Sequence, residues 1–242
     1  MRRFFKEGLS AQAREVELDG EEFHHLKKVL RLSPGDSVSL FNGRGLALSG
    51  RIGSIGRSSA IITIEGPEEG RSESPVKIIL LQALLKGDRP DFIVQKATEL
   101  GAMEVCFYLT PRTVPRVDAE TKEKKRGRWR KIAIEAAKQC GRDVLPEVSI
   151  ARDLRDALST HDQGLRIQLW EKEGGLSIKE ALSPHDLITV LVGPEGGLSA
   201  EEAEDAERAG FKKVSFGPRI LRAETAAIAV ISVVQHALGD LY

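Results

Sequence analysis

The sequence predicts an α/β protein in two parts, a small β-barrel followed by a larger domain with a mostly parallel sheet. Short β-type segments with close turns fill the region before residue 66. Strands and helices alternate from residue 76 onward, which is typical of a mostly parallel sheet covered on both faces. Between them lies a polar run rich in Gly, Pro and Ser, residues 66–75, which we interpret as a linker. We therefore place the domains at residues 1–72 and 73–242.

Composition and charge exclude several classes of protein. The 242 residues carry 36 basic and 36 acidic side chains, so the chain is not a generally cationic nucleic-acid binder. The longest apolar run, residues 226–234, is far below the roughly 20 residues of a membrane span, and no secretory signal opens the chain. We expect a cytoplasmic protein with reduced thiols and no metal site, because Cys106 and Cys140 are far apart and His24 and His25 have no clustered ligands around them.

The N-terminal part contains three clear strand signals and one helix signal. A helix is predicted within residues 20–30, where apolar side chains recur at helical spacing. Turn residues at 42–45 and 56–58 separate the predicted strands, which cover residues 37–41, 47–55 and 59–65. Short strands joined by close turns favour a small barrel.

The C-terminal part begins with the long apolar run 76–85. Ser177 with Glu180 and Ser199 with Glu202 form capping boxes, each of which predicts a helix start. The other predicted strands are residues 105–109, 165–170, 187–192 and 214–216, and the other predicted helices are 88–100, 153–158 and 224–238. Residues 112–142 form a basic segment, largely helical, with eleven Lys or Arg against four Asp or Glu. Charge alone favours two interpretations equally, a binding surface for a polyanion and a helix face exposed to solvent.

Two loops carry the chemistry that the sequence offers. Residues 193–198 and 216–223 each follow a predicted strand, each contain Gly-Pro, and each precede a helix. In an open α/β sheet, ligands bind beyond the C-terminal ends of the strands, and glycines let them approach the main chain. Few charged side chains lie in these loops, which favours a flat, mostly uncharged aromatic ligand. Motifs for phosphate-binding P-loops, dinucleotide folds, serine hydrolases and zinc proteases are absent from the sequence.

The two loops also carry a family resemblance. Residues 191–199 (Leu-Val-Gly-Pro-Glu-Gly-Gly-Leu-Ser) and 216–226 (Phe-Gly-Pro-Arg-Ile-Leu-Arg-Ala-Glu-Thr-Ala) resemble the C-terminal motifs of the RsmE-type small-subunit ribosomal RNA uridine N3-methyltransferases of the SPOUT superfamily. Phe216 and Ala223 are mild departures from that pattern, which has Leu and Thr there. The resemblance extends over nearly the whole chain through residues 2–5, 24–31, 35–36, 86–89, 95–101 and 136–142, with Pro146 and Glu147.

The resemblance implies a PUA-like N-terminal barrel for RNA and a SPOUT domain with a trefoil knot. It also implies S-adenosylmethionine as the methyl donor, 16S ribosomal RNA or the small ribosomal subunit as the substrate, and a homodimer with the site near the subunit interface. The expected donor-binding residues come from the two loops and the preceding strand end. They are Leu169, Val192, Gly193, Pro194, Glu195, Gly196, Gly197, Phe216, Gly217, Ile220, Leu221 and Thr225.

Arg222 is our candidate catalytic residue. A guanidinium there would stabilise negative charge on O2 or O4 of the uridine as N3 loses its proton. The alternative is a structural salt bridge to Glu195 or Glu224, and either carboxylate is a candidate general base. The expected RNA contacts are Arg2, Arg3, Lys27, Lys28 and Arg31 of the barrel, with Arg112, Arg116 and Arg142 across the cleft. Arg142 with Gln139 is alternatively a brace for the basic helix.

Three other functions fit parts of the sequence. One is a SPOUT methyltransferase for a ribose 2′-oxygen or another base. The second is an inactive RNA-binding or assembly factor, against which the intact motifs at 193–197 and 222–225 argue. The third is an enzyme that acts on a small-molecule nucleotide. The barrel and the basic segment argue against this function.

Overall fold

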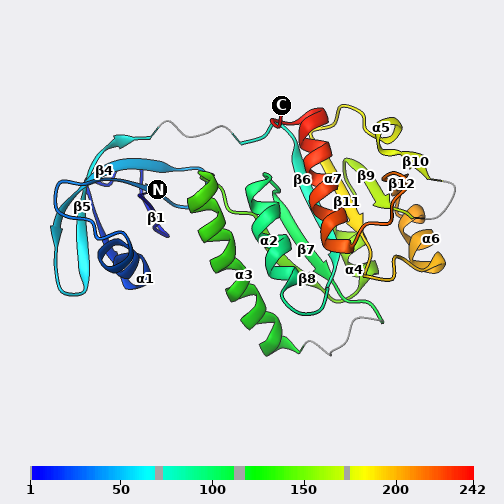
Figure 1. The fold of residues 1–242 in the computed structure, drawn as a ribbon, viewed down its shortest axis with the longest axis horizontal. Helices are drawn as coiled ribbons and strands as arrows, with labels where there is room; N and C mark the ends of the chain where they lie inside the picture. Colours follow the sequence, from blue (N-terminus) through cyan, green and yellow to red (C-terminus); the bar gives the residue numbers. More distant parts are fainter. Residues whose placement is uncertain (1, 69–72, 112–117, 172–174) are drawn as a thin grey trace. The chain divides into compact units, whose positions relative to one another are not determined.

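The computed structural model describes residues 2–68, 73–111, 118–171 and 175–242. The chain forms two compact units (Figure 1), which are Met1–Glu73 with Ile134–Leu145, and Ser74–Ala133 with Pro146–Tyr242. The boundary at residues 72 and 73 remains a prediction.

The segment Ile134–Leu145 belongs to the first unit, although it lies far from the rest of that unit in the sequence. Its side chains pack against the first unit. Ala137 is fully buried in a cluster with Phe41 and Ala47, and Leu145 packs against the same cluster. Lys138 donates to Glu22 at 3.1 Å and Glu135 at 2.8 Å.

The first unit is a curled, mixed five-stranded sheet, which confirms the predicted barrel-like β domain. Its alternating side chains point into one apolar core, as the buried Val16 and Leu18 of β2 show. Gly50 permits the sheet to curl, since a Cβ there would lie 2.6 Å from the Thr63 carbonyl oxygen. The sheet order is β1(Arg3–Phe5), β3(Ser37–Phe41), β4(Ala47–Ile55), β5(Ser59–Pro67) and β2(Glu15–Asp19).

The predicted helix within residues 20–30 has two parts. An α-helical turn, α1(Gly20–His24), runs into a π-helical turn, η1(His25–Val29). The next residue but one, Arg31, has a φ of +53°, the left-handed region that non-glycine residues rarely occupy. A side-chain pattern at helical spacing does not distinguish α from π hydrogen bonding, so this detail lies beyond the sequence analysis.

The second unit is built on a seven-stranded sheet in which the described strand pairs are all parallel, as predicted. The trefoil knot remains a prediction. The sheet order is β10(Leu176–Ser177), β12(Lys212–Ser215), β9(Leu165–Leu169), β11(Leu187–Val192), β6(Lys77–Ala83), β7(Glu104–Tyr108) and β8(Glu147–Ala151). Strand β11 therefore lies at the centre, between β9 and β6, and carries the glycine-rich motif at its C-terminal end.

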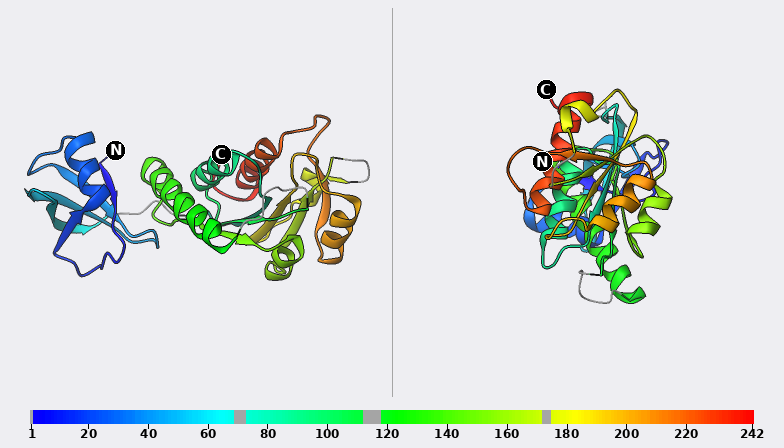
Figure 2. Two further views of the ribbon diagram at one scale, coloured as in Figure 1. Left: turned by 90° about the horizontal axis from the view of Figure 1, so that it is seen from below. Right: turned by 90° about the vertical axis from the view of Figure 1, so that its right-hand side faces the viewer.

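Helices cover both faces of this sheet (Figure 2). One face packs against α2(Arg89–Glu99), α7(Ala223–Leu238) and Trp129 of α3(Ala119–Cys140). The other face packs against α4(Leu154–Thr160) and α6(Ala200–Arg208). A short helix, α5(Ile178–Ala181), follows β10. Two-sided burial explains why β6 and β11 have nearly continuous apolar sequences.

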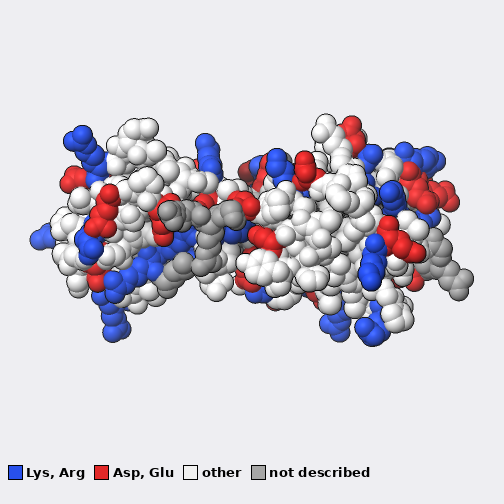
Figure 3. Space-filling model, turned by 90° about the horizontal axis from the view of Figure 1, so that it is seen from above, with Lys and Arg blue, Asp and Glu red and all other residues white. Residues whose placement is uncertain are grey.

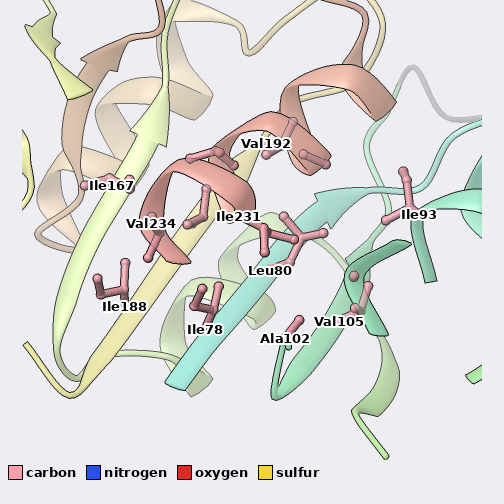
Figure 4. Packing of buried hydrophobic residues seen from close by; sticks show 14 of the residues in the cluster. Ile78, Leu80, Ile93, Ala102, Val105, Ile167, Ile188, Val192, Ile231 and Val234 are labelled. Atoms are coloured by element: carbon pink, nitrogen blue, oxygen red, sulfur yellow. The ribbon is translucent and has the colours of Figure 1, made fainter. Parts of the chain in front are cut away.

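The larger core lies between the sheet and α7 (Figure 4). Ile231 and Val234 of α7 pack over Leu80 and Ile188 of the two central strands, and all four are fully buried. Val192 of the same cluster is the last residue of β11. The rigid core thus ends where the glycine-rich motif begins, so the motif is held by the best-packed part of the unit.

Candidate functional site

A cavity lies beyond the C-terminal ends of β9, β11 and β12, where the sheet topology predicts a ligand site. Three chain segments form its walls, namely residues 169–171, 192–198 and 216–226. The two loops that the sequence analysis singled out therefore line one cavity together. We call residues 193–198 the glycine loop and residues 216–222 the second loop.

The glycine loop is a tight turn with little space around its main chain. The N–H of Gly197 donates to the Pro194 carbonyl oxygen at 2.9 Å, and Gly197 has a φ of +70°. A Cβ on Gly193 would lie 2.9 Å from the Leu198 nitrogen and 3.0 Å from the Gly197 carbonyl carbon. Glycine is required at both positions, at Gly197 for its left-handed φ and at Gly193 for close packing of the backbone.

Ser199 ends the loop and begins α6 with the predicted capping box. Its hydroxyl accepts from the Glu202 N–H at 3.1 Å, while the Glu202 carboxylate accepts from the Ser199 N–H at 2.7 Å. The box fixes the chain direction as it leaves the cavity.

The second loop is more exposed and leads into α7. Gly217 has a φ of +105°, which only glycine adopts readily, and Arg222 is the N-cap of α7 in an extended conformation. Ile220 is 83% exposed, an unusual state for a large apolar side chain beside a cavity. Ala223 and Ala226, on the first turn of α7, complete this wall.

Ten of the twelve expected donor-binding residues line the cavity. The exceptions are Gly196 and Thr225, both of which are exposed and do not line it. The cavity adds seven residues that the sequence analysis did not assign, namely Trp170, Glu171, Leu198, Pro218, Arg219, Ala223 and Ala226. Five of the seven directly adjoin an expected residue, and Glu171 and Ala223 lie two positions from one, so extending each segment by one or two positions finds all seven.

Glu171 places a negative charge at the cavity. Its carboxylate lies against Gly197, in the space that a side chain at that position would fill. Because the side chain follows directly after β9, the same strand end supplies Leu169, Trp170 and Glu171 to the wall. The wall therefore combines apolar groups, main-chain groups and carboxylates.

Arg89 connects the glycine loop with the start of α7. Its Nη1 donates to Glu195 at 2.7 Å, and its Nε lies 4.0 Å from the Glu224 carboxylate. These are the two carboxylates that the sequence analysis offered to Arg222 as salt-bridge partners. Arg222 is exposed, and within the described residues the ion pairs show Arg89 beside those carboxylates instead. The motif at residues 86–89, noted only as part of the resemblance, thus contributes directly to the site.

The expected RNA contacts differ in exposure. Lys28 and Arg31 are exposed, Arg2 is half exposed beside Asp36 at 2.8 Å, and Lys27 donates to the Gly56 carbonyl oxygen at 2.8 Å. Basic and acidic side chains are interspersed on the face shown in Figure 3. Exposure leaves Arg2, Lys28 and Arg31 accessible to a polyanion.

Two further expected RNA contacts, Arg3 and Arg142, also have internal partners, and two are not described. Arg3 is only 5% exposed, is paired with Asp143, and lies 4.6 Å from the centre of the Phe41 ring. It supports the first unit rather than presenting a charge on its surface. Arg142 pairs with Glu73 at 2.6 Å, a different brace from the Gln139 alternative. Arg112 and Arg116 lie outside the described residues.

The described parts of the chain show neither a cluster of metal ligands nor a membrane-spanning helix. They hold no group of three or more His, Cys, Asp or Glu side chains suited to a metal ion. None of their helices combines the length and the apolar character that crossing a membrane requires.

Comparisons with known proteins agree with this arrangement. A family model for an RNA methyltransferase domain matches residues 72–235, and one for an RNA methyltransferase PUA domain matches residues 18–65. The ribosomal RNA small subunit methyltransferase E of Bacillus subtilis is 32% identical over 248 residues, covering 98% of this chain and 96% of the relative.

Solved structures give the same result over the whole chain. A putative methyltransferase from Legionella pneumophila, in complex with bound SAM, is 33% identical with a TM-score of 0.92 and 99% coverage of both chains. The ribosomal RNA small subunit methyltransferase E of Neisseria gonorrhoeae, bound to S-adenosyl methionine, is 33% identical with a TM-score of 0.90 and full coverage of both chains. With its two matched domains and this full-length similarity, the chain belongs to the RNA methyltransferase family whose curated members are named ribosomal RNA small subunit methyltransferase E.

Proposed function

We propose that the protein is an S-adenosylmethionine-dependent methyltransferase that methylates N3 of a uridine in 16S ribosomal RNA. The observation that carries the proposal is the cavity in which the two Gly-Pro loops meet beyond the ends of adjacent parallel strands. Family membership supports ribosomal RNA methyl transfer, and the motifs of the RsmE type support uridine N3 as the acceptor.

The cavity is suited to a donor of this chemistry. Leu198, Leu221 and Ala226 offer apolar contacts for an aromatic ring, and Gly193 and Gly197 bring main chain without side chains to the cavity wall. Glu171 and Glu195 place carboxylates on the cavity wall, which would favour a ligand with a positively charged sulfonium group. When bound, S-adenosylmethionine supplies an electrophilic methyl group.

Arg222 is proposed to act on the target base. Its side chain is exposed at the N-terminal end of α7, next to the second loop. A guanidinium at this place would stabilise the negative charge that forms on O2 or O4 as N3 loses its proton. Arg89 pairs with Glu195 and lies beside Glu224. Because these two carboxylates have Arg89 as their partner, they do not hold Arg222 in a salt bridge.

Two carboxylates remain the candidates for the general base. Glu195 lines the cavity and pairs with Arg89. The Glu224 side chain is 15% exposed, and its Oε2 is buried with no hydrogen-bond partner among the described residues. A buried carboxylate oxygen without a donor is an acceptor available for a proton. Glu224 is therefore the carboxylate we favour as the base.

Ribosomal RNA is proposed to bind to the exposed cations of the first unit, mainly Arg2, Lys28 and Arg31. Contacts of this kind go to phosphates and make affinity fall steeply with salt. We also propose that the protein acts in the cytoplasm, because its proposed substrate is ribosomal. Arg3 and Arg142 would contribute indirectly, by fixing the structure around these side chains.

A homodimer is proposed as the active form. Ile220 is 83% exposed beside the cavity, and a second copy of the chain would cover this apolar side chain. Light scattering on the purified protein should then give twice the 26.5 kDa of the chain. A monomer that methylates at full rate would contradict this part of the proposal.

The direct test is methyl transfer followed by product mapping. The protein is incubated with labelled S-adenosylmethionine and small ribosomal subunits, or their RNA, from cells that lack the activity. Mass spectrometry of the nucleosides should identify N3-methyluridine. A 2′-O-methyl nucleoside would overturn the specificity, and the absence of product with every RNA would overturn the enzymatic function.

A further inference from the structure

Two buried polar side chains lie behind the glycine loop without lining the cavity. Gln82 is near the end of β6, Tyr108 is the last residue of β7, and both are 0% exposed. In the sheet, Gln82 is the register partner of Val192, which immediately precedes the loop. A buried amide or hydroxyl costs free energy unless it is hydrogen-bonded. The hydrogen-bond partners of Gln82 and Tyr108 therefore indicate the role of these two side chains.

Both side chains donate to the first carbonyl groups of the glycine motif. The Tyr108 hydroxyl donates to the Val192 carbonyl oxygen at 3.0 Å. The Gln82 Nε2 donates to the Gly193 carbonyl oxygen at 3.2 Å and to the Ala83 carbonyl oxygen at 3.1 Å. Two strands that contribute no side chain to the cavity thus hold the chain at the point where β11 becomes the loop.

Holding a carbonyl also fixes the rest of its peptide unit. In a planar trans peptide, the N–H points away from the C=O of the same unit. The Tyr108 contact on Val192 therefore directs the Gly193 N–H to the opposite side. The next peptide, from Gly193 to Pro194, has no N–H, so its carbonyl is its one polar group, and Gln82 occupies it.

We propose that Gln82 and Tyr108 are positioning residues of the donor pocket. They hold the main chain at Val192 and Gly193 in the conformation that binds the donor, and they do so without touching it. The inference rests on the proposed function, because it assigns the loop to S-adenosylmethionine. Preorganisation of this kind raises affinity by removing the cost of ordering the loop when the ligand binds.

Tyr108→Phe is the cleanest variant, because it removes one oxygen atom and keeps the ring. One buried hydrogen bond changes an equilibrium by roughly five- to tenfold. The Kd for S-adenosylhomocysteine should therefore rise by that factor in calorimetry. The KM for S-adenosylmethionine should rise in parallel, while kcat at saturating donor stays within about twofold, since the interaction acts on binding alone.

Gln82→Met tests the second contact with a side chain of similar size. It should raise the Kd by at least as much as Tyr108→Phe. The matched control is Thr189→Val, which alters a fully buried hydroxyl on the same strand, three residues before Val192 and outside the cavity. It should leave the Kd unchanged.

The outcomes separate a positioning role from a structural one. A lower melting temperature with an unchanged Kd in Tyr108→Phe and Gln82→Met would overturn the inference, because stability alone would then depend on these bonds. An equal rise in Kd in Thr189→Val would overturn it too, because the Thr189 hydroxyl has no hydrogen-bond partner among the described residues, and a buried change in β11 that breaks no hydrogen bond would then weaken binding as much. If the unmodified protein binds no S-adenosylhomocysteine, the proposed function fails, and the inference fails with it.

Discussion

Replacing Gly193 by alanine adds a single methyl group at a point of the cavity wall that is crowded by backbone atoms. The new Cβ would lie 2.9 Å from the Leu198 nitrogen, 3.0 Å from the Gly197 carbonyl carbon and 3.1 Å from the Leu198 Cγ. Two of these neighbours are backbone atoms, which do not rotate away. Ordinary contact begins near 3.4 Å, so the glycine loop must open by about 0.5 Å. Forcing an extra methyl group into a packed site costs about 1–3 kcal/mol.

That cost falls on the conformation that is proposed to bind the donor. A loss of about 1–3 kcal/mol corresponds to a roughly 5- to 150-fold higher Kd for S-adenosylhomocysteine, measured by calorimetry. The matched control is Gly127→Ala in α3, where nothing lies within 4 Å of the added Cβ. Because alanine is the better helix former, this control should gain about 0.5–1 kcal/mol of stability and bind the ligand normally. Normal binding by Gly193→Ala would refute the reasoning.

Three further predictions concern catalysis, RNA binding and stability. Arg222→Ala should lower kcat by roughly 10²–10³ while the Kd for S-adenosylhomocysteine changes little, and equal losses in both would remove Arg222 from the chemistry. Lys28→Ala should reduce by roughly 0.7–1 the slope of log affinity for ribosomal RNA against log salt, and an unchanged slope would exclude a phosphate contact. The Glu104 carboxylate, which accepts a hydrogen bond from His161 Nε2 at 3.2 Å, raises the pKa of His161 above its usual 6.5, so the stabilisation by this bond is complete below that pH and is lost as the pH rises through the raised pKa. Urea unfolding between pH 6 and 9 should show this decline in the protein and not in Glu104→Gln, and parallel curves would contradict it.

The sequence predicted those features that depend on neighbouring residues. Both capping boxes are present as expected, at Ser177 and Ser199, because a hydroxyl and a carboxylate three residues apart suffice to form them. Strands β3 and β4 have the predicted bounds, since turn residues delimit them. Strand β12 begins two residues earlier than expected, at Lys212, where charged side chains conceal it.

Four strands were missed, namely β1, β2, β8 and β10, of which β1 and β10 are only three and two residues long. Residues 15–19 alternate polar and apolar side chains, so a signal for β2 was present. Strand β8 also alternates, with Val148 and Ile150 next to polar residues, but it lies at the edge of the large sheet, where none of its side chains is fully buried. Edge strands depend on pairing with a neighbour more than on their own pattern.

The parts of the site that sequence reasoning missed are contacts between distant residues. Arg89 and Glu195 are 106 positions apart, and Tyr108 and Val192 are 84 apart. Their meeting depends on the strand order of the sheet, which places β6 and β7 beside β11. Local patterns identified the loops, whereas the residues that hold those loops in place required the tertiary structure.

The most direct test of the account is a crystal structure of the protein grown with S-adenosylhomocysteine. We predict that the ligand lies between the glycine loop and the second loop, with hydrogen bonds to main-chain atoms of both and its adenine ring near Leu198 and Leu221. A ligand bound elsewhere on the protein, or held chiefly by charged side chains outside these two loops, would contradict the central claim.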